Sequence, residues 1–237
     1  MQRFYIPSPD IQKNIIDIRE PRVVFQAGKV LRMRTGSKFS IFDGKGREVV
    51  VEVLEIDRRK IIGNVMEAVE RNTEPKLDIH LYQAIPKKPA LFEWVVQKAT
   101  EIGVNHIYPL ITDRTEKKRL SKFERLQMIA IEAAEQSRRT HIPALHHPVN
   151  FAEAIKKTKH AYLAYEYEDK KSLADYLPAI QTHKEAHIFI GPEGGFDQKE
   201  IDLAIKNKVD CFTFGPRILR TETAAIAALS IVLLSGD

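Results

Sequence analysis

The first 70 or so residues have the hydrophobic pattern of a small β-rich unit. The stretch KFSIFDGKGREVVVEVLEID, residues 38–57, places the turn-forming DGKG between two partly alternating runs rich in Ile, Phe and Val. That arrangement is typical of a β-hairpin. A third apolar run, KIIGNVMEAV, follows at residues 60–69. Short strands joined by tight turns predict a small barrel.

A polar segment, ERNTEPKLD at residues 70–78, is interrupted by Pro75 and is expected to be a linker. Beyond it, strand-like runs alternate with helical ones. The expected strands are IHLYQAI, HIYPLIT, HAYLAY, HIFI and DCFTF, and the expected helices are PALFEWVVQKATEIG, about 123–138, from about 198, and near 224–234. This alternation predicts an α/β domain with a parallel sheet covered on both faces. We therefore expect a β-barrel domain at 1–70 and an α/β domain at 75–237.

Two helices show informative patterns. The long helix near 123–138 is preceded by SKFE, in which Ser121 and Glu124 can form a capping box. Its apolar residues recur at helical spacing and predict one core-facing side: Phe123, Leu126, Ile129, Ala130, Ala133 and Ala134. The last helix, AAIAALSIVLL, is apolar on every side and so must be covered all round, which a dimer interface offers readily.

Composition narrows the class of protein. A formal net charge of +5 and a sequence pI near 9.1 indicate a mildly basic chain of the kind that associates with polyanions. The single cysteine, Cys211, excludes an internal disulfide and a multi-cysteine zinc site, and it suits a reducing compartment. The N-terminus lacks a secretory pattern and no apolar run is long enough to span a membrane, so we expect a cytoplasmic protein. His146 and His147 accompany no H-E-x-x-H pattern, and no metal is expected.

Two expected strands end in similar loops. HIFIGPEGG and CFTFGPRILRTETAA each run from an apolar strand through Gly-Pro toward a helix. Ligands bind beyond the carboxyl ends of parallel strands, so the two loops are expected to face one pocket. Neither loop matches a dinucleotide or P-loop pattern, and Glu193 in GPEGG would repel a phosphate. A cation or zwitterion suits the loop better, and S-adenosylmethionine has that character.

The same loop carries two structural predictions. Asp197 and Glu200 form a D-x-x-E start signal for the next helix. Glu193 is expected to brace its own loop by accepting backbone N–H bonds, although a contact with the ligand stays open.

FIGPEGGF together with FGPRILRTETAAIAAL closely resembles the bacterial 16S ribosomal RNA uracil-N3 methyltransferase family, which belongs to the knotted SPOUT class. PKKPALFEWVVQKATEIGV, TDRT and IAIEAAEQSRRTHIP agree in order, so the resemblance covers about residues 80–235. It implies a deep trefoil knot in the C-terminal α/β domain, a PUA-like RNA-binding β-barrel at the N-terminus, and a homodimer. The implied cofactor is S-adenosylmethionine and the implied partner is 16S rRNA in the small ribosomal subunit. The residue pattern alone predicts only an unknotted doubly wound sheet.

Site residues follow from the resemblance, position by position. The implied cofactor contacts are Ile190, Gly191, Gly195, Phe214, Gly215, Leu219, Arg220 and Thr221, with a further wall at Ala164 and Tyr165. Arg114, Arg139 and Arg220 are candidates for contacts with uracil or phosphate, although exposed arginines without such a role remain the alternative. Glu135 and Glu222 are candidate bases, while Arg138 and Arg217 only adjoin these motifs.

The barrel offers a basic stretch, GKVLRMRTGSK, with Lys29, Arg32, Arg34 and Lys38 as candidate RNA contacts. In a strand, Arg32 and Arg34 would share a face and could meet phosphates. A basic edge strand that resists aggregation explains the same residues. A second basic stretch, RTEKKRLSKFER, opposes the dipole at a helix start, which favours an RNA role.

The expected reaction is methylation of N3 of an unpaired uridine. A ribose 2′-O-methyltransferase of the same class is the alternative activity. A non-catalytic RNA-binding factor for ribosome assembly is the alternative from another class.

Overall fold

The computed structural model describes residues 1–7, 9, 14–71, 73–120 and 122–235. The chain divides into two compact units. Unit 1 contains Met1–Glu74 and Ala134–Ile142, and unit 2 contains Pro75–Ala133 and Pro143–Asp237. Residues 134–142 thus group with the N-terminal unit, although they lie within the segment expected to form the second domain.

Unit 1 is built on a five-stranded sheet of order β1-β3-β4-β5-β2. Its strands are β1 (Arg3–Tyr5), β2 (Ile15–Ile18), β3 (Lys38–Phe42), β4 (Glu48–Ile56) and β5 (Ile61–Ala68). The predicted hairpin is present, since β3 and β4 pair antiparallel. In its turn, Asp43 Oδ1 accepts hydrogen bonds from the backbone N–H groups of Lys45 (2.8 Å) and Arg47 (3.1 Å). The third apolar run forms β5, which pairs with β4.

Arg3 forms a buried ion pair and joins the two segments of unit 1 through hydrogen bonds. Arg3 Nη2 lies 3.0 Å from Glu48 Oε2, and Arg3 also donates to the backbone carbonyls of Ala134 and Arg139, both at 2.9 Å. Burial on its own would raise the pKa of Glu48, but hydrogen bonds from Arg3 and Arg71 outweigh it and the pKa is lowered. Glu48 is therefore a buried carboxylate held in its charged form by two arginines.

The basic stretch of unit 1 is not a strand. Helix α1 (Pro21–Phe25) continues into the π-helix η1 (Gln26–Val30), and Arg32 has a positive φ of 53°. The shared face that a strand would give Arg32 and Arg34 is therefore absent, because the backbone coils and turns before β3 begins at Lys38.

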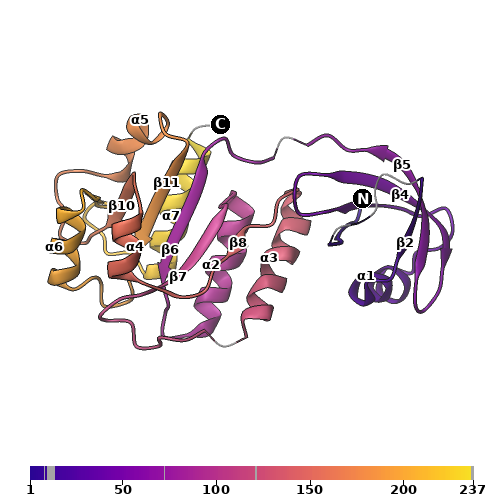
Figure 1. Ribbon diagram of the computed structural model, residues 1–237, viewed down its shortest axis with the longest axis horizontal. Coiled ribbons are helices and arrows are strands. Elements are labelled where there is room, and N and C mark those ends of the chain that lie inside the picture. The colour runs from indigo at the N-terminus through magenta and orange to yellow at the C-terminus, as the bar shows by residue number, and fades with distance from the viewer. Residues whose placement is uncertain (8, 10–13, 72, 121, 236–237) are drawn as a thin grey trace. The chain divides into compact units, whose positions relative to one another are not determined.

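Unit 2 contains a parallel sheet of order β12-β10-β11-β6-β7-β8, with β9 pairing with β7. Its strands are β6 (Asp78–Ala84), β7 (His106–Ile111), β8 (Ala144–Leu145), β9 (Val149–Asn150), β10 (Ala161–Ala164), β11 (Glu185–Ile190) and β12 (Asp210–Phe212). Helices cover both faces, with α2 and α7 on one and α4 and α6 on the other (Figure 1). This confirms the predicted α/β arrangement.

The four predicted helices are present as α2 (Pro89–Ile102), α3 (Phe123–Ser137), α6 (Gln198–Lys206) and α7 (Thr221–Leu234). Helix α4 (Phe151–Lys157) was not predicted, and η2 (Leu173–Tyr176) and α5 (Leu177–Ile180) form a helical stretch between β10 and β11. The start signal of α6 is confirmed, because the side chains of Asp197 and Glu200 form a capping box. The capping box predicted for α3 includes Ser121, which lies outside the described residues. Helix α3 runs from unit 2 into unit 1, as Ala134 begins the second segment of unit 1.

Helix α7 begins three residues earlier than predicted, at Thr221. Ala224, Ala225, Ala228 and Leu229 are buried within unit 2, whereas Leu234 is 61% exposed. One unit thus covers most, but not all, of this apolar helix. Among the residues described, no helix has the combined length and apolar character that crossing a membrane requires.

Candidate functional site

The loops that carry the candidate residues follow neighbouring parallel strands of unit 2. Ala164 at the end of β10 pairs with Phe212 of β12, and Ile190 at the end of β11 pairs with Gln83 of β6. The strands therefore end at nearly the same level, and the segments after them leave from one edge of the sheet. This is the edge at which α/β proteins bind ligands.

Thr221 joins three of these segments through its hydroxyl group. Thr221 Oγ1 donates to the carbonyl oxygen of Gly191 (2.5 Å) and accepts from Gln83 Nε2 (2.8 Å). Thr221 is 6% exposed and Gln83 is fully buried. The first turn of α7, the GPEGG loop and the end of β6 are thereby held together.

Gln83 is absent from the sequence-based candidates. Its Nε2 also donates to the carbonyl oxygen of Ala84 (2.9 Å), while its Oε1 is buried without a hydrogen-bond partner among the described residues. Most buried polar atoms have a partner, so this oxygen is available to a ligand donor. The sequence feature that could have indicated Gln83 is its position as a single glutamine in the otherwise apolar end of the run IHLYQAI.

Glycine conformation brings another side chain into this site. Gly195 has a positive φ of 69°, and a Cβ atom there would collide with the carboxylate of Glu166. Glu166 follows β10 and is exposed, so a carboxylate lies directly against the GPEGG loop. Gly215 in the second loop also has a positive φ, of 91°. Both positions favour glycine because side chains rarely adopt this backbone conformation.

Glu193 does not brace its own loop. Its Oε1 accepts a hydrogen bond of 3.0 Å from the backbone N–H of Lys87, in the connection between β6 and α2. The expectation of a structural role through a backbone N–H therefore holds, but the partner belongs to another loop. The acid in GPEGG is engaged in linking two loops of the site.

Arg114 docks the TDRT segment onto the same loop. Its Nη1 donates to the carbonyl oxygen of Gly194 (2.6 Å), and its Nη2 lies 3.4 Å from Asp197 Oδ2. The neighbouring Asp113 N–H donates to Glu200 Oε1 (3.0 Å), and burial raises the pKa of Glu200. Arg114 is therefore beside the cofactor-loop candidates and is not a free surface arginine.

The second loop presents an exposed guanidinium. Arg220 occupies the N-cap position of α7, next to Thr221, and is exposed. Within the described part of the chain its guanidinium has no ion-pair partner. Phe214 packs edge-on against Phe212 with ring centroids 5.2 Å apart, and Glu222 lies in the first turn of α7. Arg220 is thus placed to contact a ligand at the sheet edge.

The remaining two catalytic candidates belong to unit 1. Arg139 Nη2 lies 2.6 Å from Glu74 Oε2, and the Arg139 side chain is 3% exposed. Glu135 Oε1 accepts from the Tyr5 N–H (2.7 Å) and pairs with Arg22 Nη2 (2.6 Å). These contacts stabilise unit 1, and a role for either side chain in the reaction stays a prediction.

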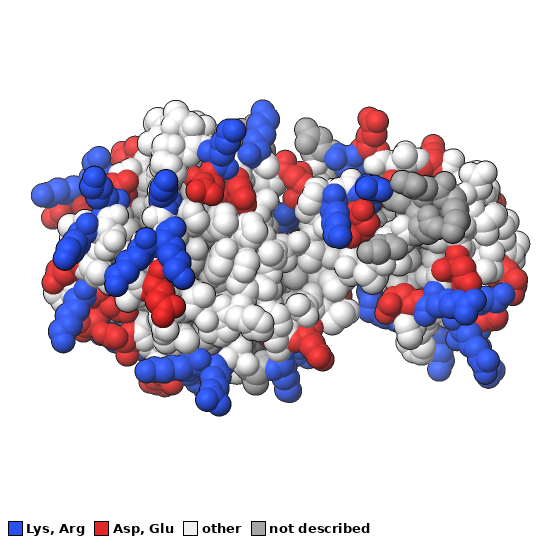
Figure 2. Space-filling model, viewed as in Figure 1, with Lys and Arg blue, Asp and Glu red and all other residues white. Residues whose placement is uncertain are grey.

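The charge distribution is mixed. Figure 2 shows Lys and Arg side chains interspersed with Asp and Glu around α6 of unit 2, while the face over β6, β7 and β8 carries few charged groups. In unit 1, Lys29 Nζ lies 5.4 Å from the centre of the Phe25 ring, and Arg32, Arg34 and Lys38 are exposed. These four basic side chains remain accessible to a polyanion.

The described loops suit a zwitterionic ligand. The end of β6 offers the Oε1 of Gln83, which has no partner among the described residues, and the loops offer the carboxylate of Glu166, the guanidinium of Arg220 and glycine backbone that allows close approach. The same groups could meet hydrogen-bond donors, an ammonium and a carboxylate, respectively.

Comparison with known families defines the class of protein. Residues 73–233 match the family of RNA methyltransferase domains, and residues 27–66 match the RNA methyltransferase PUA domain. The first match covers most of the chain and includes the loops described above. The chain therefore belongs to the class of RNA methyltransferases.

The relatives specify the family further. Ribosomal RNA small subunit methyltransferase E of Bacillus subtilis is 32% identical over 226 residues, which is 88% of each chain. The enzyme of the same name from Aquifex aeolicus is 29% identical over 236 residues, covering 98% of this chain and 99% of the other. The chain belongs to the ribosomal RNA small subunit methyltransferase E family.

Two solved structures are similar over nearly their whole length. A protein of Legionella pneumophila described as a methyltransferase, in complex with the cofactor SAM, has a TM-score of 0.86 and 30% identity, covering 99% of this chain and 98% of that one. Ribosomal RNA small subunit methyltransferase E of Neisseria gonorrhoeae, bound to S-adenosyl methionine, has a TM-score of 0.85 and 28% identity, covering 97% and 95%.

Proposed function

We propose that this protein is an S-adenosylmethionine-dependent methyltransferase that acts on N3 of a uridine in 16S rRNA within the small ribosomal subunit. The observation that carries the proposal is the hydroxyl of Thr221, which joins the GPEGG loop, the start of α7 and Gln83 at the carboxyl edge of the sheet. The two similar structures with bound S-adenosylmethionine and the names of the relatives support it.

The cofactor would be held largely by backbone and by a few side chains. We assign its binding to the ends of β10 and β11 and to both glycine loops, and we add Gln83 to the residues inferred from the sequence. Those residues are Ala164, Tyr165, Ile190, Gly191, Gly195, Phe214, Gly215, Leu219, Arg220 and Thr221. When bound, the cofactor would supply a methyl group on a sulfonium, whose sulfur leaves as a neutral thioether.

The protein must hold uracil unpaired and remove its N3 proton. Arg220 is exposed beside Thr221 and would stabilise negative charge on a uracil carbonyl oxygen as the N3 proton leaves. Glu222, one residue beyond Thr221, is the carboxylate nearest in sequence that could accept this proton. Arg114 is held against Gly194 and Asp197, so its role would be to fix the shape of the loop.

The finer features of the fold belong to the same proposal. We infer that the segments around the two glycine loops form a trefoil knot of the SPOUT type and that α7 contributes to a homodimer. The partly exposed end of α7, with Leu234 61% exposed, supports an apolar interface there. We assign RNA binding to the PUA-like unit, with Lys29, Arg32, Arg34 and Lys38 as phosphate contacts.

Nucleoside mass spectrometry tests the reaction. Small subunits that lack the modification are incubated with the protein and S-adenosylmethionine, and the digested 16S rRNA is analysed. N3-methyluridine is expected, whereas a 2′-O-methyl nucleoside would replace the proposed reaction with the alternative one. If calorimetry detects no S-adenosylmethionine binding with or without RNA, the non-catalytic RNA-binding alternative is favoured.

A further inference from the structure

Several histidines that are distant in the sequence meet on one face of the unit 2 sheet. His80 of β6 pairs in register with His106 of β7 and with His187 of β11. His146, just after β8, lies with its ring centroid 5.3 Å from that of His106. The parallel register therefore creates a row of imidazoles that the sequence does not show.

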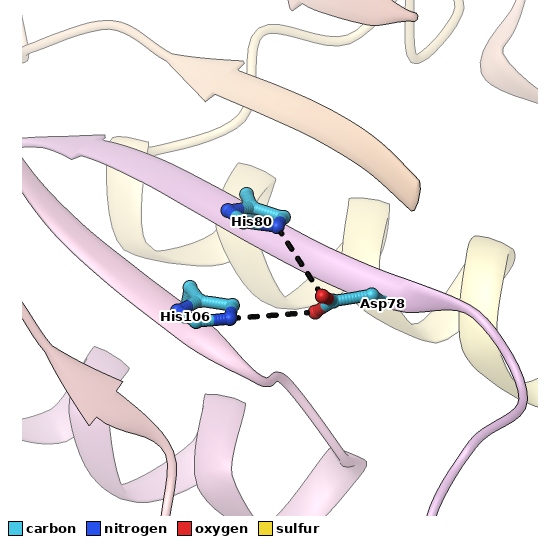
Figure 3. Close-up of side chains that lie close together, drawn as sticks. All are labelled: Asp78, His80 and His106. Carbon is cyan, nitrogen blue, oxygen red and sulfur yellow. Dashed lines mark ion pairs between the residues drawn. The ribbon is translucent and has the colours of Figure 1, made fainter. Parts of the chain in front are cut away.

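The carboxylate of Asp78 faces two of these imidazoles, those of His80 and His106 (Figure 3). Its Oδ2 is 3.6 Å from His80 Nε2, and its Oδ1 is 3.6 Å from His106 Nε2. One donor atom from each of the three residues lies within 4.8 Å of the others. A tetrahedral zinc ion with bonds of about 2.0–2.1 Å separates its ligand atoms by about 3.4 Å. The two carboxylate–imidazole separations are already close to this spacing.

The polar atoms of this cluster lack partners. Both ring nitrogens of His80 and Oδ1 of Asp78 are buried without a hydrogen bond to any described residue. Buried polar atoms in proteins nearly always have a partner, and an unfilled set on adjacent side chains indicates a bound group. Because the set combines two imidazole nitrogens with a carboxylate, its chemistry suits a divalent transition metal such as zinc.

His146 supplies the outer support that metal-binding histidines usually have. Its Nε2 lies 3.0 Å from Nδ1 of His106, the ring nitrogen that faces away from Asp78. The His146 ring is in turn stacked on Tyr108, with centroids 3.9 Å apart and planes 3° apart. Such a partner fixes the orientation of the ligating ring.

We propose that Asp78, His80 and His106 bind one zinc ion, with water completing its coordination. The rings of His80 and His106 are nearly parallel, 11° apart with centroids separated by 4.2 Å, so they must tilt for their lone pairs to converge on the ion. The side chains of Asp78, His80 and His106 are 45%, 12% and 29% exposed, which provides an entry path.

The proposed ion is structural and separate from the cofactor loops. Asp78 begins β6 and Gln83 lies near its other end, five residues away, which corresponds to about 17 Å along a strand. An ion here would link the first residues of β6 and β7. It is not assigned any part in methyl transfer.

A second set of donors shares His80. Glu185 and His187 also lie within 4.8 Å of it, and Glu185 Oε1 is 3.8 Å from His187 Nε2. The Asp78 set is preferred because its carboxylate approaches both imidazoles and because His146 supports one of them. A substitution in each set can therefore distinguish them.

Metal titration of the full-length protein tests the proposal. After treatment with EDTA and dialysis, the protein is titrated with Zn²⁺ against a chromogenic chelator, and with Co²⁺ while its visible absorption is recorded. We expect one equivalent of Zn²⁺ and the intense bands of tetrahedral Co²⁺. Asp78→Asn and His106→Ala should each weaken binding at least tenfold, whereas His183→Ala is a control because His183 stacks on His160 outside the cluster.

The outcomes separate the possibilities. Zn²⁺ should raise the melting temperature of the wild type and not that of Asp78→Asn, while methyl transfer stays the same with and without added metal. Loss of binding in Glu185→Gln with full binding in Asp78→Asn would assign the ion to the other set and overturn the proposal. Failure of the wild type to bind one equivalent would overturn it as well. Asp78→Asn keeps the shape of a half-exposed side chain, so it remains informative if His106→Ala does not fold.

Discussion

Replacing Thr221 with valine removes a hydroxyl group while preserving the shape of the side chain. The hydroxyl makes two hydrogen bonds, at 2.5 Å to the Gly191 carbonyl and at 2.8 Å to Gln83 Nε2. Each is worth about 1 kcal/mol net, and a buried group left without a partner costs about 1–3 kcal/mol. The two lost hydrogen bonds account for about 2 kcal/mol. The penalty for unpartnered groups adds only about 1 kcal/mol, because Gln83 keeps its bond to the Ala84 carbonyl. We therefore expect Thr221→Val to lower the free energy of unfolding by about 3 kcal/mol.

Cofactor binding should weaken as well, because the same hydroxyl holds the GPEGG loop against α7. If about 1.4 kcal/mol of this loss falls on the ligand-competent arrangement of the loop, the dissociation constant for S-adenosylmethionine rises about tenfold. Urea denaturation gives the stability and calorimetry gives the affinity.

Two control variants isolate the hydroxyl group. Thr221→Ser retains both hydrogen bonds and loses one methyl group, so it should bind the cofactor like the wild type. Thr223→Val makes the same chemical change at an exposed position two residues along α7 and should alter neither quantity by more than about 0.5 kcal/mol. Wild-type stability and affinity in Thr221→Val would refute the view that this hydroxyl organises the site.

Three further predictions concern other parts of the molecule. Gly195→Ala should destabilise unit 2 by about 1–2 kcal/mol and weaken cofactor binding, because φ is positive there and Glu166 occupies the space of a Cβ; unchanged calorimetry would contradict this. The stability of unit 1 should fall as the pH drops below the ordinary range of a glutamate, because the unfolded chain then takes up a proton at Glu48, whereas the folded protein, in which the pKa of Glu48 is lowered, does so only at a lower pH. Glu48→Gln should lose about 3 kcal/mol at neutral pH by leaving Arg3 unpaired, and should flatten the acid dependence of urea denaturation. Arg220→Ala should lower the rate of methyl transfer about a hundredfold without loss of RNA binding in a filter assay, and a wild-type rate would remove Arg220 from the reaction.

The reaction at N3, the knot, the dimer and the roles of Arg139 and Glu135 are predictions drawn from the resemblance. Both Arg139 and Glu135 make ion pairs in unit 1, and a substitution there would affect stability as well as any catalytic role. Rate measurements on these two variants therefore need a parallel measurement of folding.

The sequence by itself determined the order of the longer strands and helices, because periodicity depends on residues that are close in the chain. The β3–β4 hairpin, the alternation in unit 2 and the start of α6 at Asp197 all follow from such local patterns. The same reasoning failed for the basic stretch before β3, where Lys29 lies in a π-helix and Arg32 has a positive φ. Alternating basic residues do not distinguish a strand from a coiled segment when few apolar residues fix a face.

Only the tertiary structure decided which distant side chains meet. Gln83 and Thr221 are 138 residues apart and share a hydrogen bond, and Glu193 pairs with the backbone of Lys87. The GPEGG acid that looks misplaced in the sequence is therefore a link between two loops. His80 and His106 come together because the register of parallel strands, set by packing across the whole sheet, aligns them. Register depends on long-range packing, and no local pattern in the sequence encodes it.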